Sequence, residues 1–176
     1  MKKVKHIKTP LSNEVIAGLK AGDEALLSGA IYTARDQAHL RMSEMIKKKQ
    51  ALPFILQGKT IYYCGPTPSP GRIIGSCGPT TSSRMDLFTP EILKSGVKAL
   101  IGKGTRSREV RDAIKRYGAV YFIAPGGAGA YLCEKVESCE LIAFEDLGPE
   151  AVYKLEIKDF PVVVAIDSKG NDIYSR

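Results

Sequence analysis

Short hydrophobic runs, bounded by glycine, proline or polar turns, recur along most of this chain and predict β-strands. The predicted strands cover residues 3–8, 25–32, 60–64, 72–76, 97–101, 119–124, 140–144, 152–157 and 162–166. Pro161 favours a strand start or an edge position for the last of these. The loop 65–71 holds three prolines, which exclude helix and ladder alike, so the strands on either side are expected to form a hairpin.

Between the strands, apolar residues recur at helical spacing. The predicted helices cover residues 12–19, 34–49, 89–95, 108–117 and 129–137. Ser12 and Ser107 suit helix N-caps, and Gly96 and Gly118 suit helix ends. From residue 89 onward, strand, glycine-containing loop and helix follow one another twice, which is typical of an α/β fold. Neither a repeat nor a linker interrupts this order, so we predict one α/β domain over residues 1–176.

Composition indicates a soluble globular protein, since 44% of the residues are hydrophobic and 26% are charged. The basic residues at the start are followed by a polar segment, so a signal peptide is not expected. Apolar segments stay well short of the ~20 residues that a membrane helix needs. We therefore expect a cytoplasmic protein without a membrane partner.

The net charge of +7 indicates acidic partners but does not say which kind. Lys47–Lys49 is interpreted as a solvated helix end, and the absence of tryptophan argues against a surface that stacks nucleic-acid bases. The four cysteines form no Cys-x-x-Cys pair, and only two histidines accompany them. That spacing is poor for zinc or for a self-contained iron–sulfur cluster, so free thiols are expected.

The segment Gly75–Asp86 holds the strongest chemical signal, because four consecutive hydroxyl residues lie between a Gly-Pro turn and Arg84. Outward-pointing amides beside a guanidinium favour a carboxylate or phosphate. A Gly-Pro turn followed by a Ser/Thr helix cap would explain the same residues without any function. Lys103 and the glycine loop 126–129 are expected at the carboxyl ends of neighbouring strands, where open α/β sheets bind ligands.

Asp36 and His39 lie three residues apart at the start of the predicted helix 34–49. At this spacing the two side chains can meet. A carboxylate beside an imidazole fixes its tautomer and raises its basicity, as a proton-transfer group requires. An ordinary Asp–His contact on an exposed helix start is the alternative.

Taken together, four motifs resemble the β subunit of the class I fumarases and L(+)-tartrate dehydratases. They are Thr33-Ala34-Arg35-Asp36-x-x-His39, Gly78–Asp86, Gly102-Lys103-Gly104 and Gly126–Gly129, in the family's order and spacing. The resemblance implies a swivelling β/β/α domain with a mixed sheet and flanking helices. It also implies reversible dehydration of a 2-hydroxy dicarboxylate, from malate to fumarate or from tartrate to oxaloacetate.

In the two-subunit members of this family, a [4Fe–4S] cluster is carried by the α subunit. The resemblance therefore implies that this chain binds no cofactor itself and works with a cluster-bearing α subunit in an α2β2-type heteromer. Arg35, Arg84 and Lys103 are then expected to bind the substrate carboxylate distant from the iron. Arginines can grip a carboxylate in forked fashion, whereas lysine acts as a point charge.

Thr80 matches the hydroxyl that the family is proposed to use in proton transfer, with Thr81 as a substrate-binding neighbour or replacement. A threonine hydroxyl is a poor base unless cations lie close to it, so His39 with Asp36 remains the other candidate.

The chain departs from the family at Thr105, where glycine is common, and Arg106 and Arg108 are expected to add charge near the mouth of the site. Two other interpretations stay open at this point. One is a stand-alone module that binds phosphate groups or nucleic acid, and the other is a subunit with a purely architectural role.

Overall fold

The computed structural model describes residues 4–175, which form one domain with a mixed sheet and flanking helices. The strands are β1 (Lys5–Thr9), β2 (Glu24–Thr33), β3 (Thr60–Tyr62), β4 (Ala99–Gly102), β5 (Val120–Ile123), β6 (Val136–Ala143) and β7 (Val152–Ile166). The helices are α1 (Asn13–Ala17), α2 (Asp36–Lys47), α3 (Thr89–Lys94), α4 (Arg108–Tyr117) and α5 (Gly129–Cys133), with 3₁₀ turns η1 (Ser82–Met85) and η2 (Glu145–Glu150). The predicted α/β class is confirmed.

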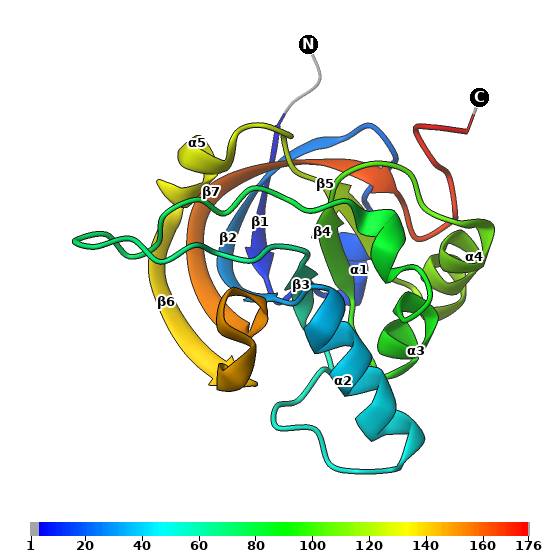
Figure 1. Cartoon of the computed structure of the whole chain (residues 1–176). Coiled ribbons are helices and arrows are strands. Elements are labelled where there is room, and N and C mark those ends of the chain that lie inside the picture. Colours follow the sequence, from blue (N-terminus) through cyan, green and yellow to red (C-terminus); the bar gives the residue numbers. More distant parts are fainter. Residues whose placement is uncertain (1–3, 176) are drawn as a thin grey trace.

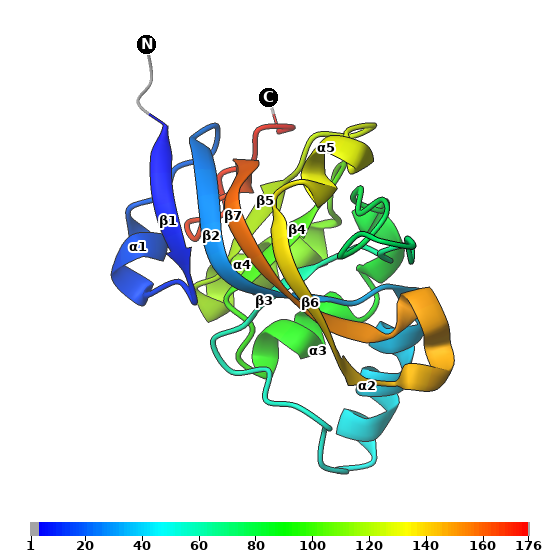
Figure 2. The ribbon, with the colours of Figure 1, turned by 90° about the vertical axis from the view of Figure 1, so that its left-hand side faces the viewer.

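The sheet closes on itself because two long strands, β2 and β7, pair with each other as well as with other neighbours. Its strand order is β1-β2-β3-β4-β5-β7-β6, and the additional antiparallel pairing of β2 with β7 closes a barrel of β2, β3, β4, β5 and β7. From β2 through β5 the barrel strands run parallel, so their carboxyl ends lie at one edge. Figure 2 shows β1 and β6 as outer strands beside β2 and β7.

Side chains that alternate along the barrel strands pack into two separate hydrophobic cores. Ala99 and Ile101 of β4 point into the barrel, whereas Leu100 packs on the outside. The outer core also includes Met42 of α2 and Ile114 of α4. Figure 1 shows α2, α3 and α4 along this side of the sheet. The helices therefore fix the outer face of the same strands whose carboxyl ends carry the predicted site residues.

Helix starts follow the polar signals in the sequence. Ser12 Oγ accepts a hydrogen bond from Val15 N, and Ser107 Oγ accepts one from Val110 N, each at 3.3 Å. Within the described part of the chain, none of the helices is long and apolar enough to cross a membrane.

Several predicted element boundaries change in the structure. The strand predicted from residue 3 begins at Lys5, and Lys3 lies outside the described residues. The strands predicted at 152–157 and 162–166 are one strand, β7. Pro161 lies inside it, between the residues that pair with β6 and those that pair with β5.

The predicted hairpin around the proline-rich loop is wrong. β3 pairs in parallel with β2 and β4, and residues 72–76 form no strand. The chain nevertheless doubles back there, because Thr67 N donates to Ser76 O at 3.0 Å and Gly75 N donates to Thr67 O at 2.7 Å. Ser76 N also donates to Thr67 Oγ1 at 2.8 Å. These local bonds do not extend into a ladder, since prolines remove donors from one arm. The loop reaches toward the left edge of Figure 1.

Candidate active site

Three chain segments that are distant in sequence meet at the carboxyl edge of the parallel strands. Residues 34–36 follow β2, residues 78–85 form a loop that crosses the end of β3, and Lys103 follows β4. Backbone bonds join these segments: Ala34 N donates to Tyr62 O at 3.0 Å, and Thr80 N donates to Tyr63 O at 2.7 Å. The barrel thereby brings most of the predicted site residues to one edge.

Arg84 is the centre of this group. Its Nε donates to Asp36 Oδ1 and its Nη2 to Asp36 Oδ2, both at 3.1 Å. The same Nη2 lies 2.7 Å from Thr80 Oγ1, to which it donates. The side chains of Arg84 and Asp36 are 47% and 32% exposed, so an anion arriving from solvent can reach them. One guanidinium therefore connects the start of α2 to the hydroxyl of Thr80.

Arg35 lies beside this cluster and is partly covered by the segment that precedes β7. Its Nε is 3.5 Å from Glu150 Oε1 and 3.9 Å from Asp36 Oδ2. These long contacts leave Nε without a hydrogen-bond partner in the described structure, although the atom is buried. A buried unpaired donor costs about 1–3 kcal/mol, so Arg35 has unused capacity to bind an anion.

Lys103 joins the site through its backbone. It forms a parallel bridge with Thr81, and its carbonyl oxygen accepts from Ser82 N at 3.1 Å. Its side chain is exposed, and Nζ forms no ion pair with any residue that the structure describes. Lys103 is thus an unpaired cation, whereas Arg35 and Arg84 both have carboxylate neighbours. Thr81 is exposed next to it.

His39 lies in a different environment from the one predicted. The expected contact with Asp36 is not formed, because Asp36 is bound by Arg84 and the imidazole turns inward. Nδ1 of His39 lies 2.8 Å from Arg35 O, and the ring packs edge-on against Tyr63 with centroids 5.3 Å apart. The residue is completely buried, which leaves its Nε2 out of contact with solvent and without a hydrogen-bond partner.

Burial, together with the nearby Arg106 cation, lowers the pKa of His39 to about 4, against the opposing effects of the Arg35 carbonyl and of Asp36. The ring is therefore neutral at physiological pH, with Nδ1 protonated so that it can donate to the carbonyl. The backbone N–H of His39 donates to the same carbonyl at 2.9 Å. His39 thus holds the backbone of Arg35 at the start of α2.

Arg106 corrects a second expectation. It does not add charge at the mouth of the site, because its side chain is fully buried and its Nε donates to Asp86 Oδ1 at 2.6 Å. Arg108 does reach solvent, with a side chain that is 83% exposed and lies 3.8 Å from Asp112. Arg106 lies in the loop after β4, whereas Arg108 is the first residue of α4, so the two arginines have different environments.

The glycine loop 126–129 follows β5, which neighbours β4 as predicted. Gly129 O accepts from Cys77 N at 3.4 Å, so the loop packs against the segment that leads to Thr80. Beside it, an apolar cavity of about 420 Å³ is lined by Lys103, Gly104 and Gly126 together with residues of β2, β5 and β7. Lys103 therefore lies between this cavity and the loop that carries Thr81.

The cysteines do not fit an iron–sulfur cluster. Among the described residues, no group of three or more histidine, cysteine or carboxylate side chains is placed to hold a metal ion. Cys64 and Cys77 are buried. Burial raises the pKa of both thiols, to about 12 for Cys77, which disfavours the thiolate that a metal requires. Cys64 and Cys77 are therefore poorly suited to bind iron.

Sequence reasoning missed Glu150, which neighbours Arg35, and the buried hydroxyl of Tyr63 behind the site. Glu150 stands in a turn with no chemical motif, and the long-range pairing of β2 with β7 brings that turn to the start of α2. Asp86 was part of the recognised motif, but nothing in the sequence identified Arg106 as its partner.

Together, the closed barrel and the cations at its carboxyl edge define an α/β domain with a cationic candidate site. Comparison with known proteins is consistent with this class. The family described as Fumarase C-terminus matches residues 1–176, and the chain belongs to that family. Curated relatives of the chain carry the names of hydro-lyases, as the sequence resemblance predicted.

One relative is "Putative L(+)-tartrate dehydratase subunit beta" of Methanocaldococcus jannaschii, which is 42% identical over 173 residues; the match covers 94% of this chain and 89% of that protein. Fumarate hydratase 2 of Leishmania major is 39% identical over 88% of this chain. The aerobic class I fumarate hydratase of Escherichia coli is 37% identical over 85% of this chain. The chain spans only 28% of each fumarate hydratase.

Proposed function

We propose that this chain is the β subunit of an iron–sulfur hydro-lyase that reversibly dehydrates a 2-hydroxy dicarboxylate, such as malate to fumarate or tartrate to oxaloacetate. The observation that carries the proposal is the contact between Arg84 and the Thr80 hydroxyl at 2.7 Å, at the edge that also holds Arg35 and Lys103. This arrangement combines anion binding with a group that can exchange a proton.

Arg35, Arg84 and Lys103 bind one substrate carboxylate in this proposal. Removing the proton from the carbon beside that carboxylate adds negative charge to it, so cations placed there stabilise the transition state more than the substrate. Arg84 is held in place by Asp36 before substrate arrives, which limits the cost of ordering it. Lys103, which has no ion-pair partner among the described residues, is available without breaking a contact.

Thr80 is the proton-transfer group that this arrangement favours. Its oxygen accepts a hydrogen bond from Arg84, and a neighbouring guanidinium favours the ionised form of a hydroxyl. His39 is fully buried and bound to the Arg35 carbonyl, so it is assigned a positioning role instead. Thr81 is exposed beside Lys103 and serves substrate binding.

A cluster-bearing α subunit completes the enzyme in an α2β2-type heteromer. Two facts support a partner: the Methanocaldococcus relative is named as a subunit beta, and the fumarate hydratases are much longer than this chain. The poor fit of the cysteines to a metal supports placing the [4Fe–4S] cluster on that partner.

The test is anaerobic reconstitution of the chain with a cluster-loaded α subunit, followed by assays of fumarate hydration and tartrate dehydration. We expect turnover only from the complex. Arg84→Ala should lower kcat/KM by about 10²-fold, as expected for loss of a transition-state contact. A folded, cluster-loaded complex that acts on no hydroxy-diacid would contradict the proposal.

A further inference from the structure

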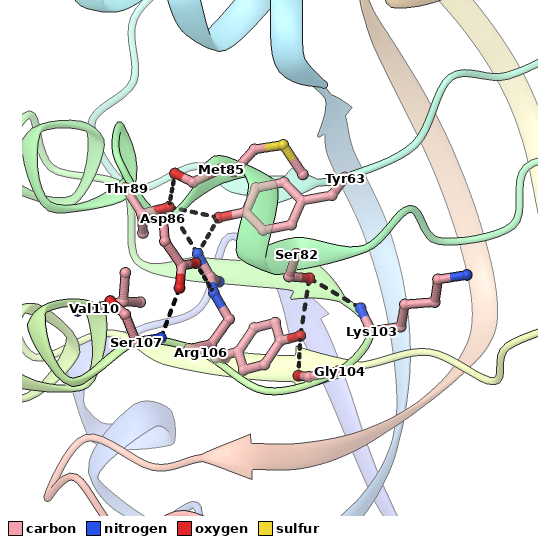
Figure 3. A network of polar contacts seen from close by, with 11 residues as sticks. Tyr63, Ser82, Met85, Asp86, Thr89, Lys103, Gly104, Arg106, Ser107 and Val110 are labelled. Carbon is pink, nitrogen blue, oxygen red and sulfur yellow. Dashed lines mark hydrogen bonds and ion pairs between the residues drawn. The ribbon is translucent and has the colours of Figure 1, made fainter.

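A buried polar network lies behind the loop 78–85 and is centred on Arg106 (Figure 3). The guanidinium of Arg106 donates from Nε to Asp86 Oδ1 at 2.6 Å. Its Nη2 donates to Thr89 Oγ1 at 2.7 Å and to the Tyr63 hydroxyl at 3.3 Å. Several fixed donors on one planar group hold their partners in a defined geometry, which a flexible ammonium group would not reproduce.

Aromatic rings and a second hydrogen bond enclose the same guanidinium. Cζ of Arg106 lies 5.2 Å from the ring centroid of Tyr63 and 4.8 Å from that of Tyr121. The other carboxylate oxygen of Asp86 accepts from Ser107 N at 2.6 Å. Asp86 is therefore bonded to two consecutive residues after β4. If the loop that contains Asp86 moved away from them, the buried charge of Arg106 would lose its carboxylate partner.

Ser82 forms a second connection between the two segments. Its Oγ accepts from Lys103 N at 3.0 Å, and its own N–H donates to Lys103 O at 3.1 Å. The Tyr121 hydroxyl lies 2.9 Å from Ser82 Oγ and 3.0 Å from Gly104 O. Burial raises the pKa of Tyr121, which keeps this hydroxyl protonated and able to donate.

Gly102 shows how closely the two segments approach. A Cβ atom at this position would lie 1.9 Å from Ser82 Oγ and 2.9 Å from Tyr63 Cδ2. No side chain fits there unless both Ser82 and the Tyr63 ring move. The glycine before Lys103 is thus required by the contact between the two segments.

We propose that Arg106 is a positioning residue that fixes the distance between the Thr80–Arg84 segment and Lys103. Arg84 lies two residues before Asp86, and Lys103 lies three residues before Arg106. The Asp86–Arg106 pair therefore links the two segments close to both cations, and we call this link the bracket. The side chain of Lys103 points away from the network in Figure 3, which leaves its charge free for a ligand. The catalytic meaning of this spacing rests on the proposed function, whereas the bracket itself can be tested without it.

Amide hydrogen exchange on the full chain, followed by NMR, tests the bracket directly. In Arg106→Met, we expect the amides of Ser82 and Lys103 to exchange at least ~10-fold faster, while that of Ile101 in β4 is unchanged. Arg111→Met is the matched control, because it removes an arginine that pairs with Asp172 elsewhere. Unchanged Ser82 and Lys103 amides, or equal acceleration of all three amides, would overturn the proposal.

Should the methionine variant fail to fold, Tyr121→Phe provides the milder test. It removes only the hydroxyl beside Ser82 and is expected to accelerate exchange of the Lys103 amide selectively. A folded Tyr121→Phe protein with native exchange at Lys103 would likewise overturn the bracket.

Kinetics of the reconstituted complex test the positioning role. Arg106→Lys keeps the charge but loses the planar fork, and we expect kcat/KM to fall about 10-fold at a temperature where the variant is still fully folded. Combined with Arg84→Ala, it should cause less than its full ~10-fold loss, since part of its effect acts through Arg84. Full additivity of the two effects would refute that role. If no reconstituted complex is active, hydrogen exchange still tests whether Arg106 links the two segments. Failure of the proposed function and failure of the proposed link can therefore be distinguished.

Discussion

Arg84 is held by Asp36 through two parallel hydrogen bonds of 3.1 Å, which tie the 3₁₀ turn η1 to the first residue of α2. Because the same guanidinium also donates to Thr80, its orientation is fixed from two sides. Asp36 is therefore a support for the anion site, and its charge competes with any ligand carboxylate that approaches Arg84.

Asp36→Asn should show whether orienting Arg84 or competing with the ligand is the larger effect of the Asp36 carboxylate. The amide keeps the shape but weakens the grip on Arg84, so we expect kcat/KM of the reconstituted complex to fall about 10-fold. Stability should change by less than about 1 kcal/mol, because the pair is partly exposed. Asp112→Asn, which alters the surface pair with Arg108, is the control and should leave the rate unchanged. Equal rates for both variants would exclude this support role.

Lys103→Met should lower kcat/KM by about 10²-fold, mainly through kcat, because the lysine is proposed to stabilise the transition state more than the substrate. The side chain has no ion pair among the described residues, so its loss should leave the melting temperature nearly unchanged. Lys94→Met removes an exposed lysine from the last turn of α3 and provides the comparison. If the two variants are equally active, Lys103 does not bind the diacid.

His39 should make the protein sensitive to acid. Its pKa is about 4 in the folded chain and about 6.5 when exposed, so the unfolded state binds more protons between these values. The free energy of unfolding should therefore decrease as pH falls from about 6.5 to about 4, with a slope of up to ~1.4 kcal/mol per pH unit from this residue.

Urea unfolding of His39→Phe at several pH values checks this prediction. The variant loses the bond to the Arg35 carbonyl, which costs about 1 kcal/mol at neutral pH, but its acid dependence should be flatter. His6→Gln, at a histidine whose side chain is 72% exposed, should retain the wild-type slope. Parallel pH curves for wild type and His39→Phe would show that His39 does not titrate in this range.

Gly65→Ala should displace Arg35 without unfolding the protein. A Cβ atom there would lie 3.0 Å from Arg35 Cδ and Nη1 and 3.0 Å from Pro149 O. We expect a rise in KM of about 10-fold, since the guanidinium must shift, with a stability loss of about 1–3 kcal/mol for overpacking. Gly18→Ala adds a methyl group in ordinary contact and should leave KM unchanged. An unaltered KM in Gly65→Ala would mean that Arg35 does not contact the substrate.

Local patterns were sufficient to predict most of the fold. Apolar runs located the strands, and Ser12 and Ser107 marked helix starts. The closure of the barrel could not be predicted, because it depends on β2 and β7 pairing across more than a hundred residues. Pro161 obscured the continuity of β7, since a proline interior to a strand is tolerated only where one side lacks a partner.

The site was only partly predictable for a related reason. Thr80 and Arg84 lie on one loop as their motif suggested, but Asp36, which was predicted to pair with His39, binds Arg84 instead. The direction in which a side chain points is set by tertiary packing. His39 turns into the apolar layer beside Tyr63, and Arg106 turns toward Asp86. Neither orientation follows from helical or strand periodicity, which describes a face of an element and not its neighbours.

A crystal structure of the reconstituted complex with a bound hydroxy-diacid would test most directly whether this chain supplies the cations for one carboxylate. We expect that carboxylate within hydrogen-bonding distance of Arg35, Arg84 and Lys103, with the Thr80 hydroxyl facing the adjacent carbon. A diacid bound in the complex without contact to any of these three cations would contradict the proposed site.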